Sequence, residues 1–169
     1  MNKEAYVRAI LILGIALGIA GCGYRIGNIN PDDPIKKIAI PTFKNSSSEP
    51  GIQTRATSTI ITRFQIDGAY EVVEPGQADA VLHGDIVGYY RDALRFTEND
   101  VTREYRLTVQ VSLELVDART GDLIWKAQHV DGETTFFINI SLPEDERRAL
   151  PDALEDLAQH VVERTVERW

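Results

Sequence analysis

A run of strict alternation over residues 104–115 constrains the fold more than any other stretch of the chain. Apolar side chains take the odd positions and polar side chains take the even ones. The odd set is Tyr105, Leu107, Val109, Val111, Leu113 and Leu115, and the even set is Glu104, Arg106, Thr108, Gln110, Ser112 and Glu114. A period of two places the sets on opposite faces of an extended strand. The pattern predicts an antiparallel strand about 40 Å long, with one face in the core and the other solvated or against something polar.

Two amphipathic segments predict the helices that cover the apolar face. The first has a stripe that recurs every four residues and ends at Asp67-Gly68; its members are Ile52, Ala56, Ile60 and Phe64. The second begins at Ser141-Leu-Pro-Glu144, which matches a capping box. Its buried stripe is Leu154, Leu157, Ala158, Val161, Thr165 and Trp169. Two helices suffice to cover one face of one sheet.

Further strands are predicted at 35–41, 69–74, 78–91 and 122–130, the last possibly extending through 134–138. In the segment 78–91, one face is predicted to hold Ala80, Leu82, Gly84, Ile86, Gly88 and Tyr90, and residues 92–103 are predicted to form a charged connection. The order is β-α-β-β-β-β-α. We therefore expect one α+β domain over residues 35–169, with two helices on one face of a four- to five-stranded, mainly antiparallel sheet.

The amino terminus indicates where the chain is exported. Lys3 and Arg8 precede an apolar run, residues 9–20, that is shorter than the roughly 20 residues needed to span a bilayer. The run ends in Ile19-Ala20-Gly21-Cys22, which resembles the lipobox of bacterial lipoproteins. We expect residues 1–21 to be a signal peptide and residues 22–34 to be an acylated cysteine with a short tether. Cys22 would carry a diacylglycerol thioether and an N-acyl chain, and two or more chains anchor stably.

The residue after the cysteine refines this prediction. Asp at that position resembles an inner-membrane retention signal, whereas this chain has Gly23. The sequence therefore favours the periplasmic leaflet of the outer membrane, with the lipid on Cys22 as the membrane contact.

Composition and motifs exclude several functions. A net charge of −8 makes the chain a poor nucleic-acid binder, and one cysteine excludes a disulfide framework. The motifs GxSxG, HExxH and GxxxxGK[ST] do not occur, and the three histidines lie far apart in the sequence. His83 and Asp85 are interpreted as a half-exposed polar pair rather than a metal site. We expect no enzyme activity, no metal and no cofactor other than the lipid.

Basic residues near the long hairpin have two readings. Arg95, Arg103 and Lys126 are interleaved with acidic residues, so they could form surface ion pairs that contribute little to stability. Alternatively, they could be donors for an anionic ligand such as a lipid phosphate.

Taken in order, these features resemble a known family. Cys22-Gly23-Tyr24 is followed by IAIPTFKN, an amphipathic helix, REYRLTVQV, DARTGDLIW, Phe136-Phe137 and a final helix ending in VERW. This series is similar to the lipopolysaccharide-assembly lipoproteins of the LptE family. The resemblance implies a non-enzymatic plug and assembly partner of the outer-membrane β-barrel LptD, which delivers lipopolysaccharide to the outer leaflet. It also implies that basic residues near the hairpin touch the glycolipid, and Arg95, Arg103 and Lys126 are the nearest candidates.

Barrel lumens are polar, so the polar face of the 104–115 strand could contact the partner there. Thr108, Gln110 and Asn99 are the predicted contact residues. The main alternative is an outer-membrane-tethered periplasmic regulator or accessory of cell-wall synthesis or secretion, and a small enzyme is a third reading. A tether of about 12 residues, about 40 Å when extended, favours work close to the membrane.

Overall fold

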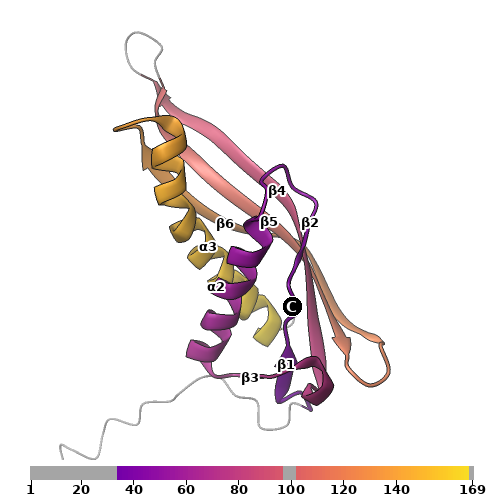
Figure 1. Cartoon of the computed structure of the whole chain (residues 1–169). Coiled ribbons are helices and arrows are strands. Elements are labelled where there is room, and N and C mark those ends of the chain that lie inside the picture. The colour runs from indigo at the N-terminus through magenta and orange to yellow at the C-terminus, as the bar shows by residue number, and fades with distance from the viewer. Residues whose placement is uncertain (1–33, 97–101, 168–169) are drawn as a thin grey trace, which may run out of the picture.

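The predicted alternating strand is β5, the central strand of the long part of the sheet (Figure 1). The computed structural model describes residues 34–96 and 102–167. Within these ranges the elements are β1 (Lys37–Ala39), β2 (Lys44–Asn45), α2 (Ile52–Asp67), β3 (Glu71–Val72), the 3-10 turn η2 (Pro75–Gln77), β4 (Ala80–Phe96), β5 (Thr102–Asp117), β6 (Leu123–Phe137) and α3 (Leu142–Glu167). Neither helix in these ranges is long and apolar enough to cross a membrane.

The sheet has six strands in the order β3-β1-β4-β5-β6, with β2 also paired to β4. β4, β5 and β6 form an antiparallel meander, whereas β1 pairs in parallel with β3 and β4, and β2 pairs in parallel with β4. The predicted α+β class is confirmed. The predicted strand count was slightly low, because β2 is only two residues long, and the short parallel pairs make the sheet mixed.

Both helices lie on the same side of the sheet (Figure 1). The predicted stripe of α2 is buried, and Gly68, with φ of 74°, ends the helix in the left-handed conformation. On β5, Leu107, Val109, Val111, Leu113 and Leu115 are fully buried beneath the helices. The predicted core face of this strand is therefore confirmed over most of its length.

Gly132 in β6 sets how closely α3 approaches the sheet. A Cβ atom at this position would lie 2.3 Å from Cβ of Leu157 and 2.4 Å from the carbonyl oxygen of Ala153. Ordinary carbon contacts need about 3.5–4.0 Å. The helix therefore packs directly on the backbone of β6 at this point.

The strand β4 departs from the prediction in two ways. It continues to Phe96, so residues 92–96 belong to the strand and not to the charged connection. Val87 is also an extra residue in β4, because Ile86 pairs with Val111 and Gly88 pairs with the next residue of β5, Gln110. This bulge reverses the alternation beyond it. Gly88 and Tyr90 thus lie on the face opposite the helices, and the prediction that they share the face of Ala80 was wrong.

Just before α3, two backbone N–H groups bond to the side chain of Asp145, whereas the capping box predicted such a contact for Glu144. The Asp145 carboxylate accepts the backbone N–H groups of Asn139 at 2.8 Å and Ile140 at 2.9 Å. These bonds, led by the one from Ile140, lower the pKa of the carboxyl. Asp145 therefore fixes the turn that carries the chain from β6 into α3.

Candidate functional site: the open face of the sheet

Polar residues of β4, β5 and β6 lie in register on the side of the sheet away from the helices. We call this surface the open face. Its rows across the three strands are Asp92–Arg106–Thr135, Tyr90–Thr108–Glu133, Gly88–Gln110–Asp131 and His83–Glu114–Lys126. The even residues of β5 thus form the middle column, and residues far apart in the sequence flank them.

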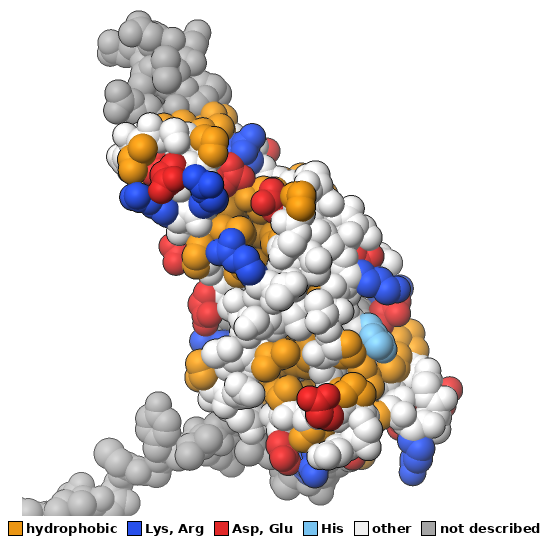
Figure 2. Space-filling view, viewed as in Figure 1, with side chains coloured by type: hydrophobic (Ala, Val, Ile, Leu, Met, Phe, Trp, Pro, Cys, Tyr) orange, Lys and Arg blue, Asp and Glu red, His pale blue; other side chains and the backbone are white. Residues whose placement is uncertain are grey.

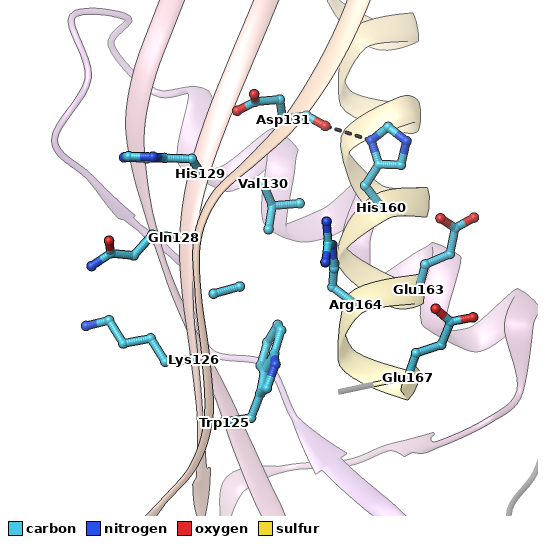
Figure 3. Close-up of a pocket in the computed structure, with 11 residues that line it drawn as sticks. Trp125, Lys126, Gln128, His129, Val130, Asp131, His160, Glu163, Arg164 and Glu167 are labelled. Carbon is cyan, nitrogen blue, oxygen red and sulfur yellow. Dashed lines mark hydrogen bonds between the residues drawn. The ribbon is translucent and has the colours of Figure 1, made fainter. Parts of the chain in front are cut away.

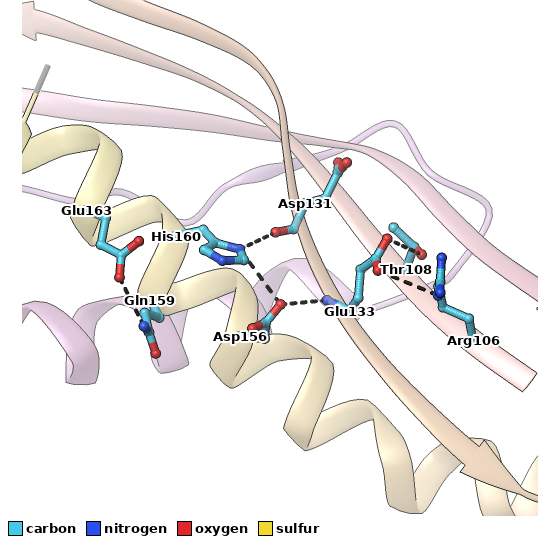
Figure 4. A network of polar contacts seen from close by, with 8 residues as sticks. All are labelled: Arg106, Thr108, Asp131, Glu133, Asp156, Gln159, His160 and Glu163. Carbon is cyan, nitrogen blue, oxygen red and sulfur yellow. Dashed lines mark hydrogen bonds and ion pairs between the residues drawn. The ribbon is translucent and has the colours of Figure 1, made fainter. Parts of the chain in front are cut away.

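Hydrogen bonds and ion pairs cross from β5 to β6 along this face. Gln110 Nε2 donates to Asp131 Oδ1 at 2.8 Å, and Thr108 donates to Glu133 at 3.3 Å. Arg106 Nε lies 3.6 Å from Glu133 Oε2. Figure 4 shows the Arg106–Thr108–Glu133 contacts on the side of β6 away from α3. The open face is therefore an ordered polar surface with its own cross-strand network.

The row of the open face that contains His83 includes an ion pair. Lys126 Nζ lies 2.6 Å from Glu114 Oε1. This hydrogen bond lowers the pKa of Glu114. The predicted ligand residue Lys126 therefore shares its charge with a neighbouring carboxylate, as the ion-pair reading of the basic residues supposed.

The structure brings only some of the predicted site residues together. Thr108, Gln110 and Lys126 share the open face, although Thr108 is only 8% exposed because its neighbours cover it. Arg95 lies in β4 and Arg103 in β5, but their side chains are not among those described. Backbone pairing places Arg95 opposite Glu104, ten residues along β5 from the row of Lys126, or about 33 Å. These basic candidates do not form one cluster. Asn99, Cys22 and the tether lie outside the described residues.

The sequence reading did not place several residues of this face, among them Tyr90, Asp131 and Glu133. Tyr90 was assigned to the helix side because a bulge leaves no mark on a period-two pattern. Asp131 and Glu133 lie in β6 beyond the predicted return strand 122–130, whose extension through 134–138 was left open. The signal for them was the unbroken run from Leu123 to Phe137, which carries no Pro.

The backbone edge of β6 is partly covered by side chains of α3. Asp156 accepts the N–H of Glu133 at 2.8 Å, and His160 Nδ1 lies 2.7 Å from the carbonyl oxygen of Asp131 (Figure 4). These contacts tie α3 to the strand that carries the acidic side of the open face. The helix α3 therefore stabilises the strand β6, whose outer side chains belong to the open face.

A groove of about 610 Å³ lies between β6 and the second half of α3. Trp125 and Val130 point into it, whereas Lys126, Gln128 and His129 point to the other side of the strand (Figure 3). A second hollow of about 540 Å³ adjoins the open face near β2 and includes His83, Asp85 and Lys126. Within residues 34–96 and 102–167, no three His, Cys, Asp or Glu side chains gather to hold a metal ion.

The helix side carries charges that are already paired. Arg91 and Tyr89 both bond to Glu146, and burial together with that hydrogen bond raises the pKa of Tyr89 well above its usual value. Arg147 and Arg148 both contact Glu144. Figure 2 shows basic and acidic side chains side by side near the upper end of this face. The helix side therefore presents no single sign of charge there.

The fold is similar to that of several small bacterial proteins, two of which are lipoproteins. Rare lipoprotein B from Shewanella oneidensis shares 14% identity, with a TM-score of 0.51 over 74% of this chain and 93% of that one. Lipoprotein B from Nitrosomonas europaea shares 14% identity, with a TM-score of 0.50 over 79% of this chain and 81% of that one. The hypothetical protein CT253 from Chlamydia trachomatis shares 11% identity, with a TM-score of 0.56 over 79% of this chain and 96% of that one. At such identities the likeness concerns the fold alone.

The family is defined by sequence. Residues 35–165 match the family described as LptE: Lipopolysaccharide-assembly. This chain belongs to that family, as its ordered motifs indicated, and is thereby a lipoprotein of the lipopolysaccharide-assembly type. No curated protein matches the sequence.

Proposed function

We propose that the protein is the plug and assembly partner of the outer-membrane barrel LptD, anchored through lipid on Cys22 to the periplasmic leaflet of the outer membrane. In this role it helps to deliver lipopolysaccharide to the outer leaflet and carries out no catalytic step. The observation that carries the proposal is the open face, whose polar rows run along three long strands. The lumen of such a barrel is polar, so rows of amides, hydroxyls and charges match it.

The ligand side of the proposal follows from the charges. Lipopolysaccharide carries phosphate, and the basic candidates for its contacts are Arg95, Arg103 and Lys126. Because Lys126 already pairs with Glu114, we expect its loss to weaken binding only modestly. The test is to measure lipopolysaccharide binding by the purified full-length protein and by its single Arg95→Glu, Arg103→Glu and Lys126→Glu variants.

Photo-crosslinking in cells tests the partner. A crosslinker at Gln110, Thr135 or Asn99 is expected to capture a large outer-membrane β-barrel protein. Thr108 is a poorer position, because its side chain is nearly covered. Gln159, exposed on α3, is the matched position on the opposite side and is expected to give much less of that product.

Depletion of the protein supplies the second measurement. We expect slower arrival of lipopolysaccharide at the cell surface and greater sensitivity to apolar antibiotics. Capture of peptidoglycan enzymes or soluble secretion factors in place of a barrel would favour the tethered-regulator alternative and refute the plug.

A further inference from the structure

Tyr90 is presented on the open face by two local features. The Val87 bulge turns it away from the helices, and Gly88 lets its ring lean along the strand. A Cβ atom on Gly88 would lie 2.3 Å from Cε2 of Tyr90 and 2.7 Å from the phenol oxygen. The side chain nevertheless stays 49% exposed. An aromatic ring is thus held against the polar sheet with much of its surface open to a partner.

Most of the charged side chains around Tyr90 are acidic. Its own row and the two adjacent rows contain the carboxylates Asp92, Glu133 and Asp131 and a single guanidinium, that of Arg106. Arg106 lies near Glu133, and both are nearly half exposed. The Asp131 carboxylate accepts a hydrogen bond from the neutral amide of Gln110, and among residues 34–96 and 102–167 no ion pair to this carboxylate is seen. The surroundings of the ring therefore have a negative balance that an incoming cation would neutralise.

We propose that Tyr90 and Asp131 together hold an arginine side chain that the barrel partner projects onto the open face. This inference rests on the proposed function, and it identifies the chemistry by which the partner is recognised. Tyr90 leans over Gly88, whose row ends at Asp131, about 10 Å away across two strand spacings. A guanidinium stacks on an aromatic face and also binds a carboxylate through two N–H groups, so one arginine can use both residues.

The same charges argue against two other occupants. A phosphate group of the glycolipid would face three carboxylates here, so the lipopolysaccharide contact belongs elsewhere on the molecule. A second copy of this chain would place its own acidic rows against these, and like charges at close range disfavour that pairing. The arginine-bearing partner is the occupant whose charge complements the surface.

The test uses the full-length lipoprotein co-expressed with its tagged barrel, and it measures the lipoprotein retained on the barrel between 0.05 and 0.5 M NaCl (about 14 Å to about 4 Å of screening length). Tyr90→Leu removes the ring, and we expect about threefold to thirtyfold weaker retention at low salt. Tyr90→Phe keeps the ring face and should stay within about twofold. Asp131→Asn should weaken retention and flatten its salt dependence. Asp152→Asn makes the same charge change on the exposed side of α3 and should change neither.

A crosslinker with an aromatic ring at position 90 then identifies the group that touches it. We expect the captured barrel peptide to carry an arginine beside the crosslinked atom. Melting temperatures of all variants are measured to confirm that they fold. If Tyr90→Leu and Asp131→Asn fold and retain the barrel as the wild type does, while Gln110 still crosslinks to it, the inference fails and the proposed function stands. A position-90 crosslink to a second copy or to lipopolysaccharide overturns the inference as well. Loss of every barrel crosslink overturns the proposed function.

Discussion

The close approach of α3 to β6 at Gly132 makes Gly132→Ala an informative perturbation. The added methyl group would lie 2.3 Å from Cβ of Leu157, 2.4 Å from its backbone nitrogen and 2.4 Å from the carbonyl oxygen of Ala153. Normal contact needs about 3.5 Å or more, so α3 has to move outward by roughly 1 Å. Two of the three atoms belong to the helix backbone and cannot rotate away. Overpacking of this kind costs about 1–3 kcal/mol, and we expect the upper half of that range.

Thermal unfolding followed by circular dichroism measures the effect. At about 4 °C per kcal/mol for a domain of this size, Gly132→Ala should melt about 8–12 °C below the wild type. Gly76→Ala is the matched control, because no heavy atom lies within 4 Å of the added methyl group and φ at Gly76 is not positive. It should change the melting temperature by only a few degrees, in either direction. Equal melting temperatures for the two variants would show that α3 does not pack on the backbone of β6 as described.

The remaining predictions concern the core, the start of α3 and the anchor. Val111→Asp should unfold the domain, since an unpaired buried charge costs several kcal/mol, whereas Gln110→Asp on the open face should leave it folded; equal losses in thermal melts would contradict the face assignment. Because the pKa of Asp145 is lowered in the folded state, its carboxylate stabilises the fold fully above about pH 4 and stops doing so as the pH falls through the folded-state pKa. The difference in melting temperature between the wild type and Asp145→Asn should therefore shrink between pH 5 and pH 2. A constant difference would show that the charge plays no part. Cys22→Ser should abolish metabolic palmitate labelling, and label persisting on that variant would exclude Cys22 as the anchor.

Hydrophobic periodicity was sufficient to predict the parts of the fold that are regular over many residues. The stripe from Ile52 to Phe64 and the alternation at 104–115 each repeat often enough to fix a helix face and a strand face. The termination of α2 at Gly68 was also predictable, because glycine readily adopts the left-handed conformation that ends a helix. These elements define the core and the class of fold.

The features that periodicity could not reveal are those that depend on pairing with a distant strand. The Val87 bulge is defined only by the register of β4 against β5, so its effect on Tyr90 was invisible in the sequence. One of the three columns of the open face was predictable from the even residues of β5. The flanking columns required the register of β4 and β6, and the burial of Thr108 required knowing which side chains surround it.

The two kinds of strand pairing in the sheet also bear on how the protein folds and opens. β4, β5 and β6 are sequence neighbours, whereas Ile38 of β1 pairs with Ala80 of β4 across a loop of about 40 residues. Pairs that close short loops form with less entropic cost, so we expect the meander to assemble before β1 docks. In native-state hydrogen exchange, amides of β5 should then be the slowest, and those of β1 and β3 should exchange through a separate, lower-energy opening. The end of the domain that follows the tether would thus be the last part to fold and the first to open.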